Sequence, residues 1–163
     1  MQFYCVQFDC SIKKKQRNGN MEKEYNPLKL ENQLCFPLYA CSKEVVKRYK
    51  PFLDKLDLTY TQYITMMVMW EKKSINVKEL GEYLFLDSGT LTPLLKKLEN
   101  KGYIKRERAK TDERNLIVSI TKKGKDLRDD ALEVPKQMGK CVNLSGEEAK
   151  QLYMLLYKLL GEL

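Results

Sequence analysis

The sequence predicts a mainly α-helical fold with a minor β component (α+β minor). From Leu28 onward, apolar residues recur every three or four positions in most segments, which is the period of an amphipathic helix. Alternation of apolar and polar residues is confined to a short segment at residues 116–120. With 163 residues and 43% hydrophobic composition, the chain suits one compact domain.

Residues 1–26 differ in composition from the rest of the chain. A cationic cluster at Lys13–Lys15 and Arg17 is followed by Asn-Gly-Asn and then by Met21. We expect a flexible N-terminal arm here, because a short charged segment at a chain end buries little apolar surface. Met21 is a candidate for the natural start, which would make the preceding residues a mis-annotated extension. The folded protomer is predicted to cover residues 27–163.

The first predicted helix covers about residues 28–50. Its apolar stripe follows spacings of four, four, three and four, at Leu30, Leu34, Leu38, Cys41 and Val45. We expect the helix to end near Lys50–Pro51, because proline disfavours helical geometry in the residue before it.

Two further helices are predicted within about residues 122–162. One runs from Lys122 to Met138 with a kink at Pro135, and the other begins at Ser145 with the Ser-x-x-Glu spacing of a capping box. The last helix has too many apolar positions for an isolated surface helix: Leu152, Leu155, Leu156, Leu159 and Leu160. Together with the first helix, it predicts a helical dimerisation region. The alternative is that the first and last helices pack on each other within one subunit.

Between these helices, about residues 60–121 predict a compact module. It consists of three helices and two strands, at Thr59–Glu71, Val77–Leu84, Ser88–Lys101, Ile104–Arg108 and Leu116–Ile120. The first of these helices is expected to direct four residues inward: Tyr63, Met66, Met67 and Trp70. Two short helices followed by a β-hairpin constitute a winged helix-turn-helix.

The charge balance indicates a polyanionic partner for this module. The chain has 30 Lys and Arg against 22 Asp and Glu, a net charge of +8, and a pI near 9.1. The major groove of double-stranded DNA admits one helix, and the second short helix is predicted to direct polar side chains toward it from Ser88, Thr90, Thr92, Lys96 and Lys97. The hairpin adds cations at Lys105, Arg106, Arg108, Lys110 and Arg114. Arg114, oriented by Asp112, fits a narrow minor groove.

Several other functions are disfavoured by composition. The chain contains no His, which excludes Ser-His-Asp and Cys-His hydrolases and removes the commonest metal ligand. We therefore expect neither an enzyme nor a bound metal or cofactor. No apolar run approaches the ~20 residues of a membrane span, and the first dozen residues do not resemble a secretion signal, so the cytoplasm is expected. The five cysteines are an odd number and favour free thiols or a redox couple over structural disulfides.

Several segments resemble the MarR family of transcriptional regulators. Asp112-Glu113-Arg114 followed by Ile117-x-x-Ile120-Thr121 is similar to the family's wing signature. The segments LKLENQLCFPLYACSKEV, YKPFLDKLDLTYTQY and LDSGTLTPLLKKLE resemble the organic-hydroperoxide-sensing (OhrR-type) subgroup. The resemblance implies a homodimeric repressor that binds an inverted-repeat operator and is released through oxidation by an organic hydroperoxide. It also implies DNA contacts from four residues of the second short helix and one of the wing: Ser88, Gly89, Thr90, Lys97 and Arg114.

The same resemblance implies a redox site. Cys35 is the sensor thiol, Tyr49 and Tyr60 of the opposite subunit stabilise its thiolate, and Tyr39 is a further family position nearby. Some members are similar to a two-cysteine design, which implies a disulfide between Cys35 and Cys141 of the partner subunit. The alternative is that a small thiol caps Cys35 and that Cys141 only packs.

Cys41 is disfavoured as a disulfide partner for Cys35. Six residues of helix separate the two α-carbons by about 9 Å along the axis, and a disulfide tolerates about 7 Å.

Three alternative functions remain open at this point. The chain could be a MarR-type repressor induced by a small aromatic ligand, with Cys35 incidental. It could be a thiol peroxidase, although a basic wing serves no purpose in such an enzyme. It could also be a protein-binding adaptor that keeps the fold without binding DNA.

Overall fold

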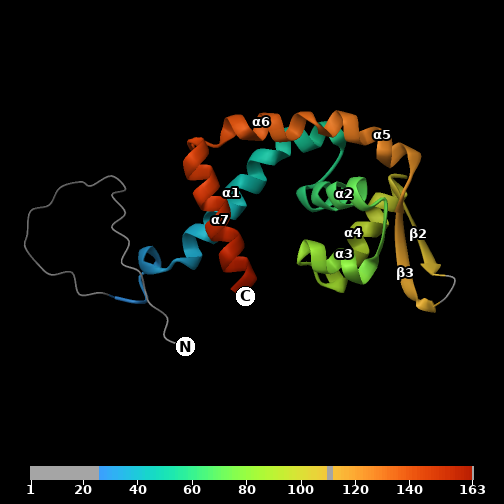
Figure 1. Cartoon of the computed structure of the whole chain (residues 1–163), viewed down its shortest axis with the longest axis horizontal. Coiled ribbons are helices and arrows are strands. Elements are labelled where there is room, and N and C mark those ends of the chain that lie inside the picture. Colours follow the sequence, from blue (N-terminus) through green and yellow to red (C-terminus); the bar gives the residue numbers. More distant parts are fainter. Residues whose placement is uncertain (1–25, 110–111, 163) are drawn as a thin grey trace, which may run out of the picture. The chain divides into compact units, whose positions relative to one another are not determined.

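The computed structural model describes residues 26–109 and 112–162 and confirms a mainly helical fold with a small antiparallel sheet (Figure 1). The chain divides into two units, residues 1–45 and 46–163. The elements follow in the order η1 (Leu30–Asn32), α1 (Cys35–Leu53), η2 (Asp54–Leu56), α2 (Tyr60–Lys72), β1 (Ser74–Asn76), α3 (Val77–Leu84), α4 (Ser88–Asn100), β2 (Ile104–Ala109), β3 (Asp112–Ile120), α5 (Lys122–Ala131), α6 (Glu133–Cys141) and α7 (Gly146–Glu162). Nearly all of the predicted N-terminal arm lies outside the described residues.

Helix α1 begins later than the apolar spacing predicted. Asn26 organises the preceding turn, because its side chain accepts from the Leu28 amide at 2.9 Å and its carbonyl accepts from Asn32 at 2.8 Å. The 3₁₀ helix η1 follows, and Gln33 then adopts an extended conformation that interrupts helical geometry. The predicted helix start near Leu28 is therefore wrong, and the first two positions of the predicted stripe precede α1.

The C-terminal end of α1 also differs from the prediction. The helix continues through Pro51 to Leu53. Proline removes one hydrogen bond from the helix, but the last turn packs Phe52 against the core and leaves Leu53 only 2% exposed. Burying these two apolar side chains outweighs the lost hydrogen bond, since each contributes about 1.5–3 kcal/mol.

The winged helix-turn-helix packs three helices against a three-stranded antiparallel sheet of order β1-β3-β2 (Figure 1). Val118 of β3 lies between Ile75 of β1 and Arg106 of β2. The sequence pattern did not identify β1, which is only three residues long, and it placed the start of β3 at Leu116 rather than at Asp112. The core of this module is fully buried and consists largely of Met66, Met69, Leu80, Leu91, Leu95, Leu98, Ile104 and Val118.

Helix α2 begins with the capping box of Thr59 and Gln62. Gln62, Met66 and Met69 are buried on the same face, whereas Met67 is 48% exposed. The predicted inward position of Met67 is therefore wrong. The buried face of α2 is rotated by about one residue from the face that the apolar pattern predicted. Trp70 is half-buried, as its position at the edge of this face requires.

The segment after the sheet forms two helices where one kinked helix was predicted. Helix α5 ends at Ala131 and α6 begins at Glu133. The break follows from Pro135, whose ring conflicts with the carbonyl four residues earlier, that of Ala131. Helix α7 then begins with the predicted capping box, in which the Ser145 amide donates to the Glu148 carboxylate at 2.8 Å and the Glu148 amide donates to Ser145 Oγ at 3.3 Å.

Many apolar side chains of α7 are exposed in the isolated chain. They are Leu152, Tyr153, Met154, Leu155, Leu156, Tyr157 and Leu160. A helix that is apolar over most of its circumference is normally buried. Across the described ranges, no helix is both long enough and apolar enough to cross a membrane.

Gly124, in the first turn of α5, lies directly against the backbone of the α4–β2 turn. A Cβ atom placed on Gly124 would lie 2.1 Å from the Tyr103 carbonyl oxygen. The glycine is therefore required by packing, because no side chain fits in this space. Gly139 in α6 provides the opposite case, with no atom within 4 Å of the corresponding position.

The first prediction compares alanine substitutions at these two glycines. Gly124→Ala is expected to lower the free energy of unfolding by on the order of 2–3 kcal/mol, through overpacking. Gly139→Ala is expected to raise it by about 0.5–1 kcal/mol, because alanine favours helix. Urea unfolding of both variants at one protein concentration measures these changes. Equal effects of the two substitutions would contradict the described packing.

Candidate nucleic-acid interface and thiol site

The N-terminus of α4 is exposed to solvent and is capped by Asp87. Asp87 accepts from the Thr90 amide at 2.9 Å and from the Thr90 hydroxyl at 2.8 Å. These hydrogen bonds, the one from the amide foremost, hold the pKa of Asp87 below its ordinary value. The cap fixes the first turn, in which Ser88, Gly89 and Thr90 are all exposed.

The two faces of α4 are divided as the sequence predicted. The buried face consists of Leu91, Leu94, Leu95 and Leu98. The exposed face carries Thr92, Lys96 and Lys97. The Thr92 hydroxyl donates to the Ser88 carbonyl at 2.8 Å, which leaves its methyl group and oxygen on the outer surface. The helix thus presents hydroxyls at its N-terminal end and ammonium groups one turn later, a set suited to base edges and phosphates.

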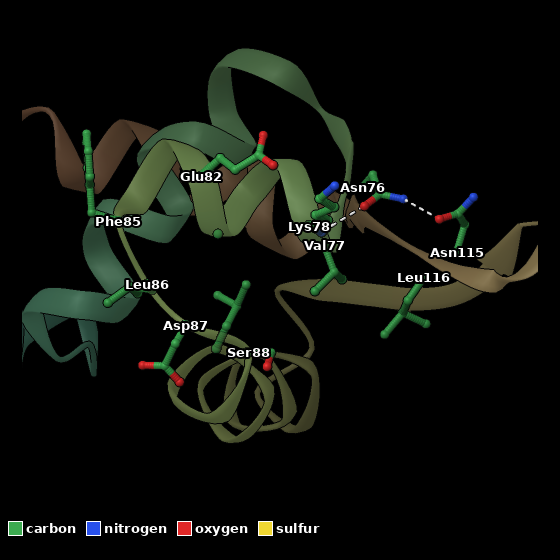
Figure 2. A pocket seen from close by; sticks show the side chains of 12 residues that line it. Asn76, Val77, Lys78, Glu82, Phe85, Leu86, Asp87, Ser88, Asn115 and Leu116 are labelled. Atoms are coloured by element: carbon green, nitrogen blue, oxygen red, sulfur yellow. Dashed lines mark hydrogen bonds between the residues drawn. The ribbon is translucent and has the colours of Figure 1, made fainter. Parts of the chain in front are cut away.

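A hollow of about 840 Å³ lies between α3, the start of α4 and strand β3. Figure 2 shows the hydrogen bond from Asn76 Nδ2 to Asn115 Oδ1, 3.3 Å long, toward one end and Phe85 at the other. Phe85 has a φ of 52° and is 72% exposed, so a large aromatic side chain occupies a left-handed position at the end of α3. The hollow is lined by both helices of the helix-turn-helix and by Asn115 and Leu116 of strand β3.

The wing is held to α4 by an ion pair between Arg106 and Glu99. Arg106 donates from Nε at 2.8 Å and from Nη2 at 2.5 Å to one carboxylate oxygen of Glu99, and its amide donates to the other oxygen at 3.0 Å. The Arg106 side chain is only 18% exposed. Its guanidinium is therefore directed to α4, although the sequence analysis assigned it to DNA.

Of the remaining wing residues, the structure describes the side chains of some and not of others. Lys105 and Arg108 are exposed on β2. Asp112 and Arg114 belong to strand β3, but their side chains lie outside the described residues, as does Lys110. Their predicted roles stay predictions.

The three cysteines that are described all have free thiols. Cys35 is exposed at the first residue of α1 rather than inside the predicted helix of residues 28–50. Cys41 is exposed on the same helix. Cys141 is half-buried at the last residue of α6, and its carbonyl accepts from the guanidinium of Arg48. Of the two exposed thiols, Cys35 is the one that the resemblance assigns as the sensor.

Tyr49 and Tyr60, the predicted thiolate partners, are neighbours in the structure. Their ring centroids lie 5.0 Å apart, and Tyr63 lies 6.0 Å from Tyr49. Burial is the main cause that raises the pKa of all three hydroxyls above the ordinary value. A tyrosine hydroxyl is protonated at neutral pH even at its ordinary pKa of about 10, so all three hydroxyls are available as hydrogen-bond donors. Tyr39 is exposed on α1, where Lys43 Nζ lies 5.2 Å from its ring centroid.

Tyr63 belongs to this group in the structure, although the resemblance did not single it out. Its spacing of three residues from Tyr60 on a helix was the available signal, because residues three apart lie on the same face. Among the residues that are described, no cluster of three or more His, Cys, Asp or Glu could hold a metal ion.

The chain is similar to several transcriptional regulators. Residues 47–131 match the family described as "Transcriptional regulator SarA/Rot". The chain is 48% identical to the "Organic hydroperoxide resistance transcriptional regulator" of Bacillus subtilis (strain 168), over 88% of this chain and 97% of that protein. It is 47% identical to the "HTH-type transcriptional regulator SarZ" of Staphylococcus aureus (strain NCTC 8325 / PS 47), over 76% of this chain and 83% of that protein.

Among solved structures, the fold is similar to that of AbfR of Staphylococcus epidermidis. Reduced AbfR bound to DNA has a TM-score of 0.69 at 34% identity and covers 82% of this chain and 92% of AbfR. Disulfide-formed AbfR has a TM-score of 0.59 at the same identity and covers 82% of this chain and 90% of AbfR.

The second prediction concerns the pH dependence of the ion pair between Glu99 and Arg106. The hydrogen bonds from Arg106 hold the pKa of Glu99 below its ordinary value of 4.5. The stabilisation by ionised Glu99 is therefore present above pH 4.5 and is lost as the pH falls through the lowered pKa. Wild-type protein is expected to exceed Glu99→Gln in free energy of unfolding near neutral pH, with the difference disappearing in acid.

Urea unfolding between about pH 3 and 7 measures this difference. Glu107→Gln is the matched control, because it removes the same charge from an exposed site on β2. A constant difference between wild type and Glu99→Gln at every pH would contradict the ion pair.

Proposed function

The chain belongs to the MarR/SarA family of transcriptional regulators, and we propose that it is a repressor released from its operator when an organic hydroperoxide oxidises Cys35. It is a DNA-binding regulator of the type represented by its hydroperoxide-resistance, SarZ and AbfR relatives, and not an enzyme. We expect it to act in the cytoplasm, where thiols are kept reduced and chromosomal DNA is accessible.

The surface of α4 supports operator binding through the major groove. Its outer face would contact bases and phosphates through Ser88, Gly89, Thr90, Thr92, Lys96 and Lys97. Arg108 would contact the adjacent backbone, and Arg114, oriented by Asp112, would enter the minor groove. Arg106 enters this proposal as the residue that fixes the wing on α4, because its guanidinium is already bound to Glu99.

The exposed apolar side chains of α1 and α7 support a homodimer. Leaving many large apolar side chains in water is unfavourable, at about 25 cal/mol for each Å². A second copy of the chain would cover them through a symmetric interface, in which the same surface is used by both subunits. A two-fold dimer presents two α4 helices to DNA, so the expected operator is an inverted repeat with half-sites about one helical turn apart.

The accessible thiol of Cys35 is the single observation that carries the redox part of the proposal. We propose that Tyr49 and Tyr60 donate to the thiolate of Cys35 of the partner subunit, since their rings are neighbours 5.0 Å apart and tyrosine hydroxyls are protonated at neutral pH. The thiolate attacks the terminal peroxide oxygen, the O–O bond breaks, and the alkoxide leaves as an alcohol after protonation. Cys35 becomes a sulfenic acid.

The sulfenic acid would then condense with the thiol of Cys141 of the partner subunit. A disulfide forms and water leaves. The half-buried position of Cys141, at the end of α6 and next to the loop before α7, suits a thiol that is reached only when the helices shift. Such a shift would move the two α4 helices out of register with their half-sites, and phosphate and base contacts would be lost together.

The third prediction tests the sensor thiol. Cys35→Ser is expected to bind the operator like wild type when reduced and to stay bound after treatment with cumene hydroperoxide. Wild type is expected to lose affinity by at least about tenfold under the same treatment, within the usual range of coupling between two sites. Fluorescence anisotropy at fixed salt measures both affinities, because binding to DNA depends steeply on salt.

Cys41→Ser is the control in that experiment, because Cys41 is another exposed thiol on the same helix. It should be released like wild type. Release of Cys35→Ser by the hydroperoxide would contradict the proposal, and release by an aromatic acid without oxidant would favour a ligand-induced repressor instead.

The fourth prediction concerns the second cysteine. After oxidation, wild type is expected to migrate as a covalent dimer on a non-reducing gel, whereas Cys141→Ser is expected to stay monomeric. A wild-type sample that remains monomeric would contradict the intersubunit disulfide and favour capping of Cys35 by a small thiol, which intact mass would detect as an added group.

A further inference from the structure

A continuous series of side-chain contacts leads from the tyrosine pair into the winged helix. The ring of Tyr49 packs against Tyr60 at 5.0 Å and against Tyr63 at 6.0 Å. Tyr63 in turn meets Trp70 edge-on, with ring centroids 6.2 Å apart. Tyr63 is only 4% exposed, so it has little room to move without displacing its neighbours.

Trp70 connects this aromatic series to a distant helix. Its indole Nε1 donates to the carbonyl oxygen of Gly124 at 2.8 Å, across 54 residues of sequence. The bond joins α2 to the first turn of α5. Trp70 is also the one tryptophan of the chain.

The first turn of α5 is in close contact with the base of the wing. Gly124 has no room for even a Cβ atom against the Tyr103 carbonyl, and its amide donates to Thr121 Oγ1 at 3.0 Å. The Thr121 amide donates to the same Tyr103 carbonyl at 3.0 Å, and the Tyr103 amide donates to the Leu98 carbonyl in the last turn of α4 at 3.1 Å. These contacts and hydrogen bonds form a continuous connection from Gly124 to the C-terminal end of α4.

We propose that Trp70 is a positioning residue that couples the tyrosine pair to the DNA-contacting helix. Oxidation of Cys35 of the partner subunit changes what Tyr49 and Tyr60 contact, and the aromatic series passes the displacement through the Trp70 hydrogen bond to α5 and α4. This inference rests on the proposed function, since it requires that the sensor thiol faces the tyrosine pair. It adds a residue that contacts neither DNA nor the thiol.

The Trp70 hydrogen bond is suited to such a role because Trp70 packs beside the core and is not one of its fully buried residues. The buried core of the module is formed by other residues, and loss of one hydrogen bond costs on the order of 1 kcal/mol. Phenylalanine in place of Trp70 keeps an aromatic ring and removes only the N–H donor and the outer ring.

The fifth prediction compares Trp70→Phe with wild type and with Met67→Leu, an exposed position on the same helix. Reduced Trp70→Phe is expected to bind the operator within about threefold of wild type. After cumene hydroperoxide, its loss of affinity is expected to be about tenfold smaller than that of wild type, a typical size for a coupling between two sites. Met67→Leu should behave like wild type in both states.

The outcomes separate the two proposals. If wild type is not released by the oxidant, the proposed function fails. If wild type and Trp70→Phe are released equally, the proposed function stands and the coupling role fails. If reduced Trp70→Phe does not bind, Trp70 is structural and the coupling role fails as well.

Tryptophan fluorescence tests the same coupling without a substitution at Trp70. Since Trp70 is the one tryptophan, its emission reports on this contact directly. Oxidation of wild type without DNA is expected to shift the emission, and oxidation of Cys35→Ser is expected to leave it unchanged. An emission spectrum of wild type that is the same before and after oxidation would overturn the proposal.

Discussion

The close contact at Gly124 is the constraint on which the arrangement of the winged helix depends. At this point the first turn of α5 touches the Tyr103 carbonyl, and the same glycine accepts the hydrogen bond from Trp70. Because the glycine packs directly on a backbone carbonyl, with no side chain between them, the angle between α5 and the sheet has little freedom to change. The direction of α4 relative to α5 is therefore fixed by packing, which is a requirement for any mechanism in which helices outside the groove control contacts within it.

A second contact fixes the wing. Arg106 binds Glu99, so strand β2 is held to the last turn of α4 at this point. The cations that remain exposed on α4 and β2 are then available to phosphates, foremost Lys96, Lys97 and Arg108. The net charge alone did not distinguish these two uses of arginine, because a side chain that organises the wing and one that contacts DNA contribute equally to it.

The sequence predicted the class of the fold, the order of the helices and strands that it identified and the division of α4 into a buried and an exposed face, because these follow from local periodicity. It failed where tertiary contacts decide. Pro51 lies inside α1 because the next residues are buried, and Ser74–Asn76 becomes a strand only by pairing with β3. For the site, the Tyr49 and Tyr60 pair was named from family resemblance, whereas Tyr63 and the contact of Trp70 with Gly124 depend on a tertiary arrangement that spacing does not encode.

We place the path by which a change at the sensor thiol alters DNA binding at the junction of α2, α5 and the α4–β2 turn. Amide hydrogen exchange in the operator-free protein, reduced and oxidised, tests this most directly. We expect faster exchange on oxidation at the amides of Tyr103, Thr121 and Gly124, with the amides of the buried second half of α4 little changed. Identical exchange at these three amides in both states would contradict it.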